Sequence, residues 1–298
     1  MLKKKDFFLL LLVVFVWGTT FTVIKLGISG MPSLVLVAGR YLLTAFPAVF
    51  FVKKPTVQTK YILLYGFVSG VLQLSVQFYA MERGMPAAVT SVLLQSAAFF
   101  TAFFAFAFFR ESISANKILG FLIAAAGLLL IALSKAEGLA YIPPSGLLLT
   151  LLSAVFWGLS NIIIKYASLD AQKKGASFDS FSFLIRSSLI PPIPLIGISF
   201  LLYPKESVLG SIFSMNLLSF ASMLYLALFG TLLGYGSWNH LLAKYPASKI
   251  APFSLLVPIS GFFFAFAILG ERLTLFQGLG SAVILLGLFI ANRPSKRS

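Results

Sequence analysis

Ten long apolar segments divide this chain, and they constrain its fold more than any other feature. A helix needs roughly 20 predominantly apolar residues to cross the hydrocarbon core of a bilayer, and each segment is close to that length. The 298 residues are 59% hydrophobic and 10% charged, whereas a soluble domain has roughly 25% charged residues. We therefore expect an all-α polytopic membrane protein embedded in the lipid bilayer. The ten expected helices are residues 7–24, 33–52, 61–81, 87–109, 118–134, 145–166, 180–202, 216–241, 249–269 and 276–292.

The basic residues of the chain are distributed unevenly between the two sides of the membrane. If ten helices alternate in direction, 16 of the 23 Lys and Arg residues lie on the side of the N-terminus and five on the other; Arg40 and Arg186 lie inside helices. Cytoplasmic loops carry such an excess of positive charge. We therefore expect both termini in the cytoplasm. Orientation explains the net charge of +15, so no nucleic-acid partner is expected.

The second half of the chain repeats the first. LLVVFVWGTTFTVIK at residues 11–25 aligns without gaps on LLSAVFWGLSNIIIK at residues 151–165. In this alignment both halves keep Trp-Gly in the middle and Lys at the end. Later matches are offset by 160 residues. The matched residues of the first half are Leu64, Tyr65, Gly70, Pro86, Ala87, Glu111, Gly120 and Gly127, and those of the second half are Leu224, Tyr225, Gly230, Pro246, Ala247, Glu271, Gly280 and Gly287.

The number of helices in each half determines how the halves relate. Five helices per half is an odd number, so the second half enters the membrane from the opposite side. Such inverted repeats are typical of secondary transporters, whose substrate site lies near the midplane between the repeats. We expect the first repeat at residues 1–138 and the second at residues 139–298.

Two pairs of related segments also match a known family. They are the WG…K endings described above and the segments RESISANKILGFLIAAAGLLLI, from Arg110, and GERLTLFQGLGSAVILLGLFI, from Gly270. With these motifs the whole chain resembles the EamA family of the drug/metabolite transporter superfamily. The resemblance implies two five-helix repeats and transport of a small metabolite. The stretches MPSLVLVAGRYLLTAFPAVFF, LGYGSWNHLL and APFSLLVPISG are similar to bacterial inner-membrane exporters of amino-acid metabolites. This similarity implies a bacterial inner membrane and efflux of compounds such as cysteine and O-acetylserine.

Other functions stay open at this point. Related carriers move purines, nucleotides or aromatic amino acids, by uptake or exchange. A phosphate substrate would require several cations, and only Arg40, Arg186, Lys25 and Lys165 are near enough to a cavity. An intramembrane enzyme is disfavoured, because no catalytic pair or phosphate-binding loop is present. The chain has no cysteine and one histidine, so we expect no metal site. We also expect no cofactor and no enzymatic activity. The expected partner is an amino-acid-like substrate, and the expected state is a monomer or homodimer.

Neutral polar and aromatic residues inside the apolar helices are the candidate substrate-binding groups. A buried glutamine must satisfy both ends of its amide, and Gly66, Gly70, Gln73 and Gln77 are spaced as one helix face. Interhelical hydrogen bonds and interfacial aromatic belts would explain the same residues without a cavity. We expect a cavity among the first, third, fourth, sixth, eighth and ninth helices. The candidates are Trp17, Thr20, Gln73, Gln77, Gln95, Trp157, Asn161, Tyr235, Trp238 and Ser254.

Six charged or titratable residues are candidates for structural or gating roles. Arg40 and Arg186 could each bind a substrate carboxylate or hold backbone carbonyls; we favour a structural clamp, because both lie near a helix start. No acid is expected at the midplane, so no buried proton relay is predicted. His240 could titrate near neutrality or serve as an interfacial histidine. The six residues are Arg40, Arg186, Lys25, Lys165, Glu82 and His240.

Overall fold

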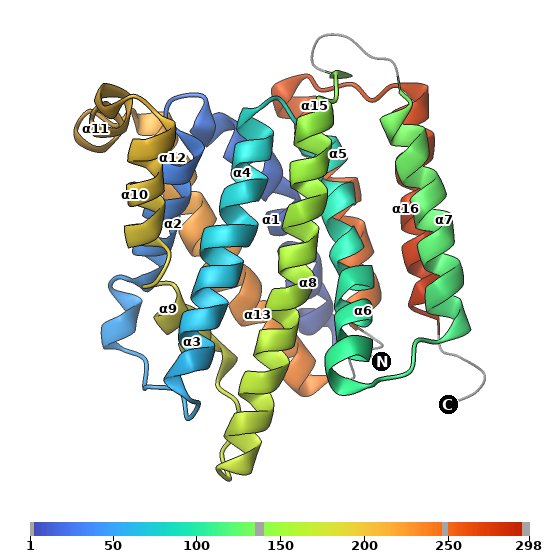
Figure 1. Cartoon of the computed structure of the whole chain (residues 1–298), viewed down its shortest axis with the longest axis horizontal. Helices are drawn as coiled ribbons and strands as arrows, with labels where there is room; N and C mark the ends of the chain where they lie inside the picture. Colours follow the sequence, from blue (N-terminus) through green and yellow to red (C-terminus); the bar gives the residue numbers. More distant parts are fainter. Residues whose placement is uncertain (1–2, 135–139, 246–249, 294–298) are drawn as a thin grey trace.

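The computed structural model describes residues 3–134, 140–245 and 250–293, and its secondary structure in these ranges is entirely helical (Figure 1). Eight helical stretches are long and apolar enough to cross a membrane, and two shorter apolar helices bring the number to the ten that were expected. In chain order the helices are α1 (Lys4–Ile28); α2 (Ser33–Ala45) with η1 (Ala48–Phe50); α3 (Thr59–Tyr65), η2 (Gly66–Leu74) and α4 (Ser75–Glu82); α5 (Ala87–Leu93), η3 (Leu94–Ser96) and α6 (Ala97–Phe109); α7 (Ala115–Ala132); α8 (Pro144–Lys173); α9 (Ser180–Ser187) and α10 (Pro192–Leu202); the short α11 (Lys205–Phe213); α12 (Leu217–Tyr225), η5 (Leu226–Leu233) and α13 (Gly234–Lys244); η6 (Ala251–Leu256) and α15 (Val257–Leu269); and α16 (Leu275–Ala291).

The outer surface of the helical bundle is strongly apolar. Large side chains on several helices are more than half exposed, including Ile193 and Leu201 on α10, which are 82% and 84% exposed, and Leu122 on α7 at 60%. Such exposure in water would be unfavourable by about 25 cal/mol for each Å² of apolar area. Hydrocarbon chains remove that cost, so these faces contact lipid. The protein is therefore a multi-pass membrane protein.

Irregular backbone occurs at matching places in the two halves. The π-helical segments η2 and η5 begin at Gly66 and Leu226, which are 160 residues apart. The 3₁₀ segment η3 (Leu94–Ser96) corresponds at this offset to the last three residues of η6 (Ala251–Leu256). Left-handed residues end α6 and α15, at Arg110 with φ of 56° and Gly270 with φ of 68°. The repeat read from the sequence is thus also a repeat of backbone geometry.

Helices α7 and α16 pack side by side at one edge of the bundle (Figure 1). Their backbones approach closely through glycines, because a Cβ on Gly120 would lie 2.4 Å from the Gly287 carbonyl oxygen and one on Gly127 would lie 2.6 Å from that of Gly280. Gly120 corresponds to Gly280 and Gly127 to Gly287 at the offset of 160 residues, so the repeat relates the first of these contacts to the second. The last helices of the two repeats therefore pack antiparallel about a pseudo-twofold axis.

Candidate functional site

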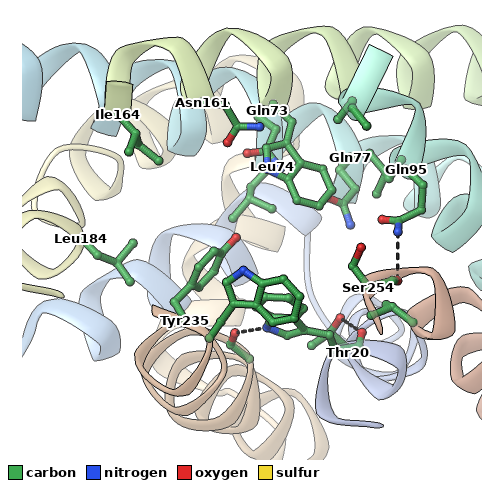
Figure 2. A pocket seen from close by; sticks show the side chains of 18 of the residues that line it. Thr20, Gln73, Leu74, Gln77, Gln95, Asn161, Ile164, Leu184, Tyr235 and Ser254 are labelled. Atoms are coloured by element: carbon green, nitrogen blue, oxygen red, sulfur yellow. Dashed lines mark hydrogen bonds between the residues drawn. The ribbon is translucent and has the colours of Figure 1, made fainter. Parts of the chain in front are cut away.

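A cavity of about 480 Å³ lies between the two repeats, and residues from both halves line it (Figure 2). This volume is within the range of small-molecule binding sites, roughly 300–1,000 Å³. The ten candidate residues read from the sequence come from six helices, and all of them lie at this one cavity. The lining includes Trp17, Thr20, Gln73, Gln77, Gln95, Trp157, Asn161, Tyr235, Trp238 and Ser254.

The cavity involves more helices than the sequence indicated. Arg40 on α2, Phe183 and Leu184 on α9, and Leu288 on α16 also line it. The prediction of six contributing helices was therefore too narrow. Apolar residues such as Leu184 and Leu288 carry no distinguishing sequence signal, because lipid-facing and cavity-facing leucines look alike in an apolar helix.

The amide side chains of the cavity differ in how well their hydrogen bonds are satisfied. Gln73 accepts a hydrogen bond from Ser69 Oγ, 3.2 Å away, and Asn161 Nδ2 donates to Thr101 Oγ1 at 3.0 Å. Gln95 Nε2 donates to the Ser254 carbonyl at 3.1 Å, where η3 meets η6 (Figure 2).

Gln77 differs from the other amides of the cavity. It is 5% exposed, and among the described residues its amide has no hydrogen-bond partner. The amide borders the cavity (Figure 2). The amide atoms are not among the fully buried atoms without a partner, so Gln77 is available to a ligand in the cavity.

The predicted common face of Gly66, Gly70, Gln73 and Gln77 is divided in the structure. A Cβ on Gly66 would lie 2.5 Å from the Ser187 carbonyl oxygen, so this glycine packs against the junction of α9 and α10. The two glutamines line the cavity instead. The cause is the π-helical geometry of η2, because a π segment has more residues per turn than an α-helix and rotates the following side chains.

An aromatic cluster forms one wall of the cavity, where α1 meets η5 and α13. The Trp17 ring lies 5.1 Å from that of Trp238 and 5.5 Å from that of Tyr235, measured between centroids. Trp17 Nε1 donates to the Gly230 carbonyl oxygen at 3.2 Å. Thr20 Oγ1 donates to the Trp17 carbonyl oxygen at 2.5 Å. These bonds fix an aromatic surface between the repeats.

The two clamp candidates have different surroundings. Arg186 Nη2 donates to the Val52 carbonyl oxygen at 3.2 Å, and Arg186 is not among the residues that line the cavity. Arg40 donates to Thr231 Oγ1 and also lines the cavity. Whether each arginine acts as a clamp stays a prediction, but the two differ in position, because only Arg40 reaches the space between the repeats.

One end of the cavity is closed by hydrogen bonds between helix termini. The Glu271 carboxylate, 8% exposed, accepts from the backbone N–H groups of Ala87 and Ala88 at the start of α5, at 2.9 and 3.0 Å. Lys25 Nζ donates to the Met81 carbonyl oxygen at 3.0 Å. The Glu271 contact ties the start of α5 in the first repeat to the segment between α15 and α16 in the second. The Lys25 contact joins α1 to α4 within the first repeat.

Glu82 makes a second set of contacts at the closed end. Its carboxylate accepts from Ser33 Oγ at 2.7 Å and from the Tyr203 hydroxyl at 2.5 Å. The start of α2, the end of α4 and the end of α10 are thereby joined. The gating candidates Lys25 and Glu82 both lie in this region.

The other end of the cavity is open and lies on the side of the termini. The cavity lining reaches Phe178 and Ser180, before and at the start of α9, and exposed Asn292 at the end of α16. Lys165 forms an ion pair with Glu111 here, with both side chains 40–48% exposed. His240 is exposed on α13 and is not part of the lining. The matched residues of the two repeats therefore have unequal surroundings, buried around Glu271 and exposed around Glu111.

Comparison with known proteins agrees with this architecture. A "Probable amino-acid metabolite efflux pump" of Salmonella typhimurium (strain LT2) is 38% identical, with 97% of this chain and 95% of the relative covered. A protein of the same name from Escherichia coli (strain K12) is 37% identical over the same shares.

One solved crystal structure has the same fold. It is 13% identical and covers 96% of this chain and 97% of its own, with a TM-score of 0.57. The model of the EamA-like transporter family matches twice, at residues 4–133 and 144–293. The chain belongs to the EamA-like transporter family, and its two halves are the repeats of that family.

Proposed function

We propose that this protein exports small amino-acid metabolites, such as cysteine and O-acetylserine, across the bacterial inner membrane. The observation that carries the proposal is a cavity between the two repeats that is lined from both of them and reaches exposed residues on the side of the termini. The two bacterial relatives named above are efflux pumps for amino-acid metabolites by name. Transport of a metabolite fits this arrangement better than catalysis, since no pair of reactive side chains lines the described part of the cavity.

Alternating access follows from the unequal ends of the molecule. If repeats 1–138 and 139–298 exchange conformations, Glu111 takes the buried position that Glu271 has now, and the closed and open ends change places. Cytoplasmic termini, expected from the charge distribution, make the present state open to the cytoplasm. An exporter loads its substrate in that state.

The cavity lining suits a small polar solute. Gln77 offers an amide oxygen and an amide N–H₂ group, and the aromatic wall around Trp17 offers apolar surface. Such neutral groups bind hydrogen-bonding solutes and do not neutralise several phosphate charges. Nucleotides are therefore poor candidates for this cavity.

One specific observation favours a second candidate substrate. Trp17, Trp157, Trp238, Tyr65 and Tyr235 all line the cavity, and aromatic rings pack well against one another. Aromatic amino acids are thus a reasonable alternative to cysteine and O-acetylserine within the same transport mechanism.

Flux measurements in proteoliposomes test the proposal. Labelled O-acetylserine, cysteine, tryptophan and adenine are compared in wild-type protein and in Gln77→Leu, which keeps the size of the side chain and removes its amide. We expect flux of the amino-acid compounds and a loss of roughly tenfold in apparent affinity in Gln77→Leu, the cost of about one hydrogen bond. Gln172→Leu, at an exposed position near the end of α8, is the matched control.

Two results would contradict the proposal. Flux of adenine without flux of any amino acid would show that the protein transports purines and not amino-acid metabolites. Equal apparent affinity in Gln77→Leu and wild type would show that the Gln77 amide does not bind the substrate.

A further inference from the structure

Arg40 is a buried cation with no acidic partner in the part of the chain that the structure describes. Its side chain is 7% exposed, and its Nε and Nη2 donate to Thr231 Oγ1 at 3.2 and 3.0 Å. The ring of Phe78 lies 5.9 Å from its Cζ. Within the described ranges no carboxylate lies at ion-pair distance from this guanidinium. Glu111 and Asp170 pair with lysines, and Glu82, Asp179 and Glu271 bind hydroxyls or helix termini. Its charge is therefore not balanced by the described part of the protein.

The free part of the guanidinium borders the cavity. A guanidinium presents five N–H donors in a planar fork. Thr231 occupies the edge formed by Nε and Nη2, and Nη1 has no hydrogen-bond partner among the described residues. Nη1 is nevertheless not sealed by protein atoms, and Arg40 lines the cavity. The edge formed by Nη1 and Nη2 is thus available to a ligand.

The charge of the cavity lining points to the kind of ligand. Of the described residues that line the cavity, Arg40 alone carries a formal charge. The hydroxyls of Tyr65 and Tyr235 lie within electrostatic reach of it, and they add polar groups without adding charge. An uncompensated cation in a low-dielectric site is unfavourable. A single negative charge on the ligand removes that cost, whereas two or more would exceed what the site balances.

We propose that Arg40 binds the carboxylate of the transported metabolite, so that the substrates are small monocarboxylates, including α-amino acids. This inference rests on the proposed function, because it takes the cavity as the transport site. A carboxylate matches two parallel N–H donors of a guanidinium in a bidentate pair. Thr231 accepts along the neighbouring edge, from Nε and Nη2, and thereby fixes the plane of the guanidinium.

Arg186 provides the contrast that separates substrate binding from a structural role. It lies in the corresponding apolar segment of the second repeat, in the last turn of α9, but it donates to the Val52 carbonyl oxygen and lies outside the cavity lining. Loss of Arg186 is expected to affect stability without changing which solutes bind. It is therefore the matched control for Arg40.

The test compares solutes that differ only in the carboxylate. Transport by purified protein in liposomes is measured for cysteine against cysteamine and for O-acetylserine against O-acetylethanolamine. We expect wild-type protein to prefer each acid by roughly 10- to 100-fold in apparent affinity, as a charge-assisted bidentate pair predicts. Arg40→Gln should reduce this preference to about threefold or less, Arg40→Lys should restore part of it because the charge remains, and Arg186→Gln should leave it unchanged.

The outcomes distinguish the inference from the function on which it rests. If wild-type protein transports acids and amines with equal affinity, Arg40 does not bind the carboxylate, although the transport function stands. This comparison needs no variant, so it holds even where Arg40→Gln fails to fold. A folded Arg40→Gln protein with an unchanged preference also overturns the inference. If wild-type protein transports none of the four compounds, the proposed function itself fails.

Discussion

Glu271 holds the closed end of the cavity, and its replacement by glutamine should open that end. The Glu271 carboxylate accepts two backbone hydrogen bonds at the start of α5, where the helix dipole also favours a negative charge. Glutamine has one acceptor oxygen, and its NH₂ group would face an N–H donor. One bond is therefore lost and the charge is removed, while the size of the side chain is kept.

The size of the effect follows from these contacts. A hydrogen bond to a charged group contributes about 1.5–3 kcal/mol, and the dipole term contributes about 0.3–1 kcal/mol. A destabilisation of the closed end by about 2–3 kcal/mol corresponds to a change of roughly 30- to 150-fold in the equilibrium between the two states. Glu111 at the matching position is exposed, and surface ion pairs of this kind contribute about 0–1 kcal/mol.

Cysteine labelling measures this equilibrium directly. The chain has no cysteine, so Ile24→Cys introduces a single thiol at a 1% exposed position of the cavity lining near the closed end. A membrane-impermeant maleimide is applied from the face opposite the termini. Labelling should accelerate by roughly 30-fold or more in Glu271→Gln and should not accelerate in Glu111→Gln. Equal labelling rates in the two variants would refute the claim that Glu271 stabilises the closed end of the cavity.

Two further substitutions, one of them with a matched control, test the packing of α7 against α16 and the contact between Tyr203 and Glu82. Gly127→Ala should lower stability by about 1–3 kcal/mol through overpacking, because its Cβ would lie 2.6 Å from the Gly280 carbonyl oxygen. Gly278→Ala, with open space around the new Cβ, should be neutral or slightly stabilising; thermal unfolding in detergent compares the two, and an equal loss in both would contradict the packing model. Tyr203→Phe removes the hydroxyl that donates to Glu82. Loss of this hydrogen bond, about 1 kcal/mol, should raise the labelling rate of Ile24→Cys from the face opposite the termini about threefold to tenfold. An unchanged rate would show that this contact does not stabilise the closed end.

Much of the fold could be read from the sequence because membrane helices have a simple signature. Length and hydropathy identified the ten apolar segments, and the matched tryptophans and glycines identified the two repeats. The pairs Gly120–Gly287 and Gly127–Gly280 illustrate why, since close helix packing in lipid depends on small residues. Neutral polar residues inside apolar helices likewise indicated the groups around the cavity.

The missed features depend on geometry that a linear pattern does not contain. The π-helical turn in η2 separates Gly66 from Gln77, although regular helical spacing places them on one face. Arg40 and Arg186 lie at similar distances from the starts of the expected helices 33–52 and 180–202, and their contacts with Thr231 and Val52 distinguish them. The unequal surroundings of Glu111 and Glu271 belong to one conformational state, so a repeat in sequence cannot reveal which end is closed.

Counterflow in proteoliposomes tests the central claim most directly, which is alternating access of one cavity to an amino-acid metabolite. Liposomes preloaded with unlabelled O-acetylserine are diluted into trace labelled O-acetylserine. An alternating-access carrier predicts a transient accumulation of label inside above the outside concentration, and cysteine outside should suppress it. Label that only equilibrates would indicate a channel, and label that does not enter above the level of protein-free liposomes would contradict the transport of this class of solute.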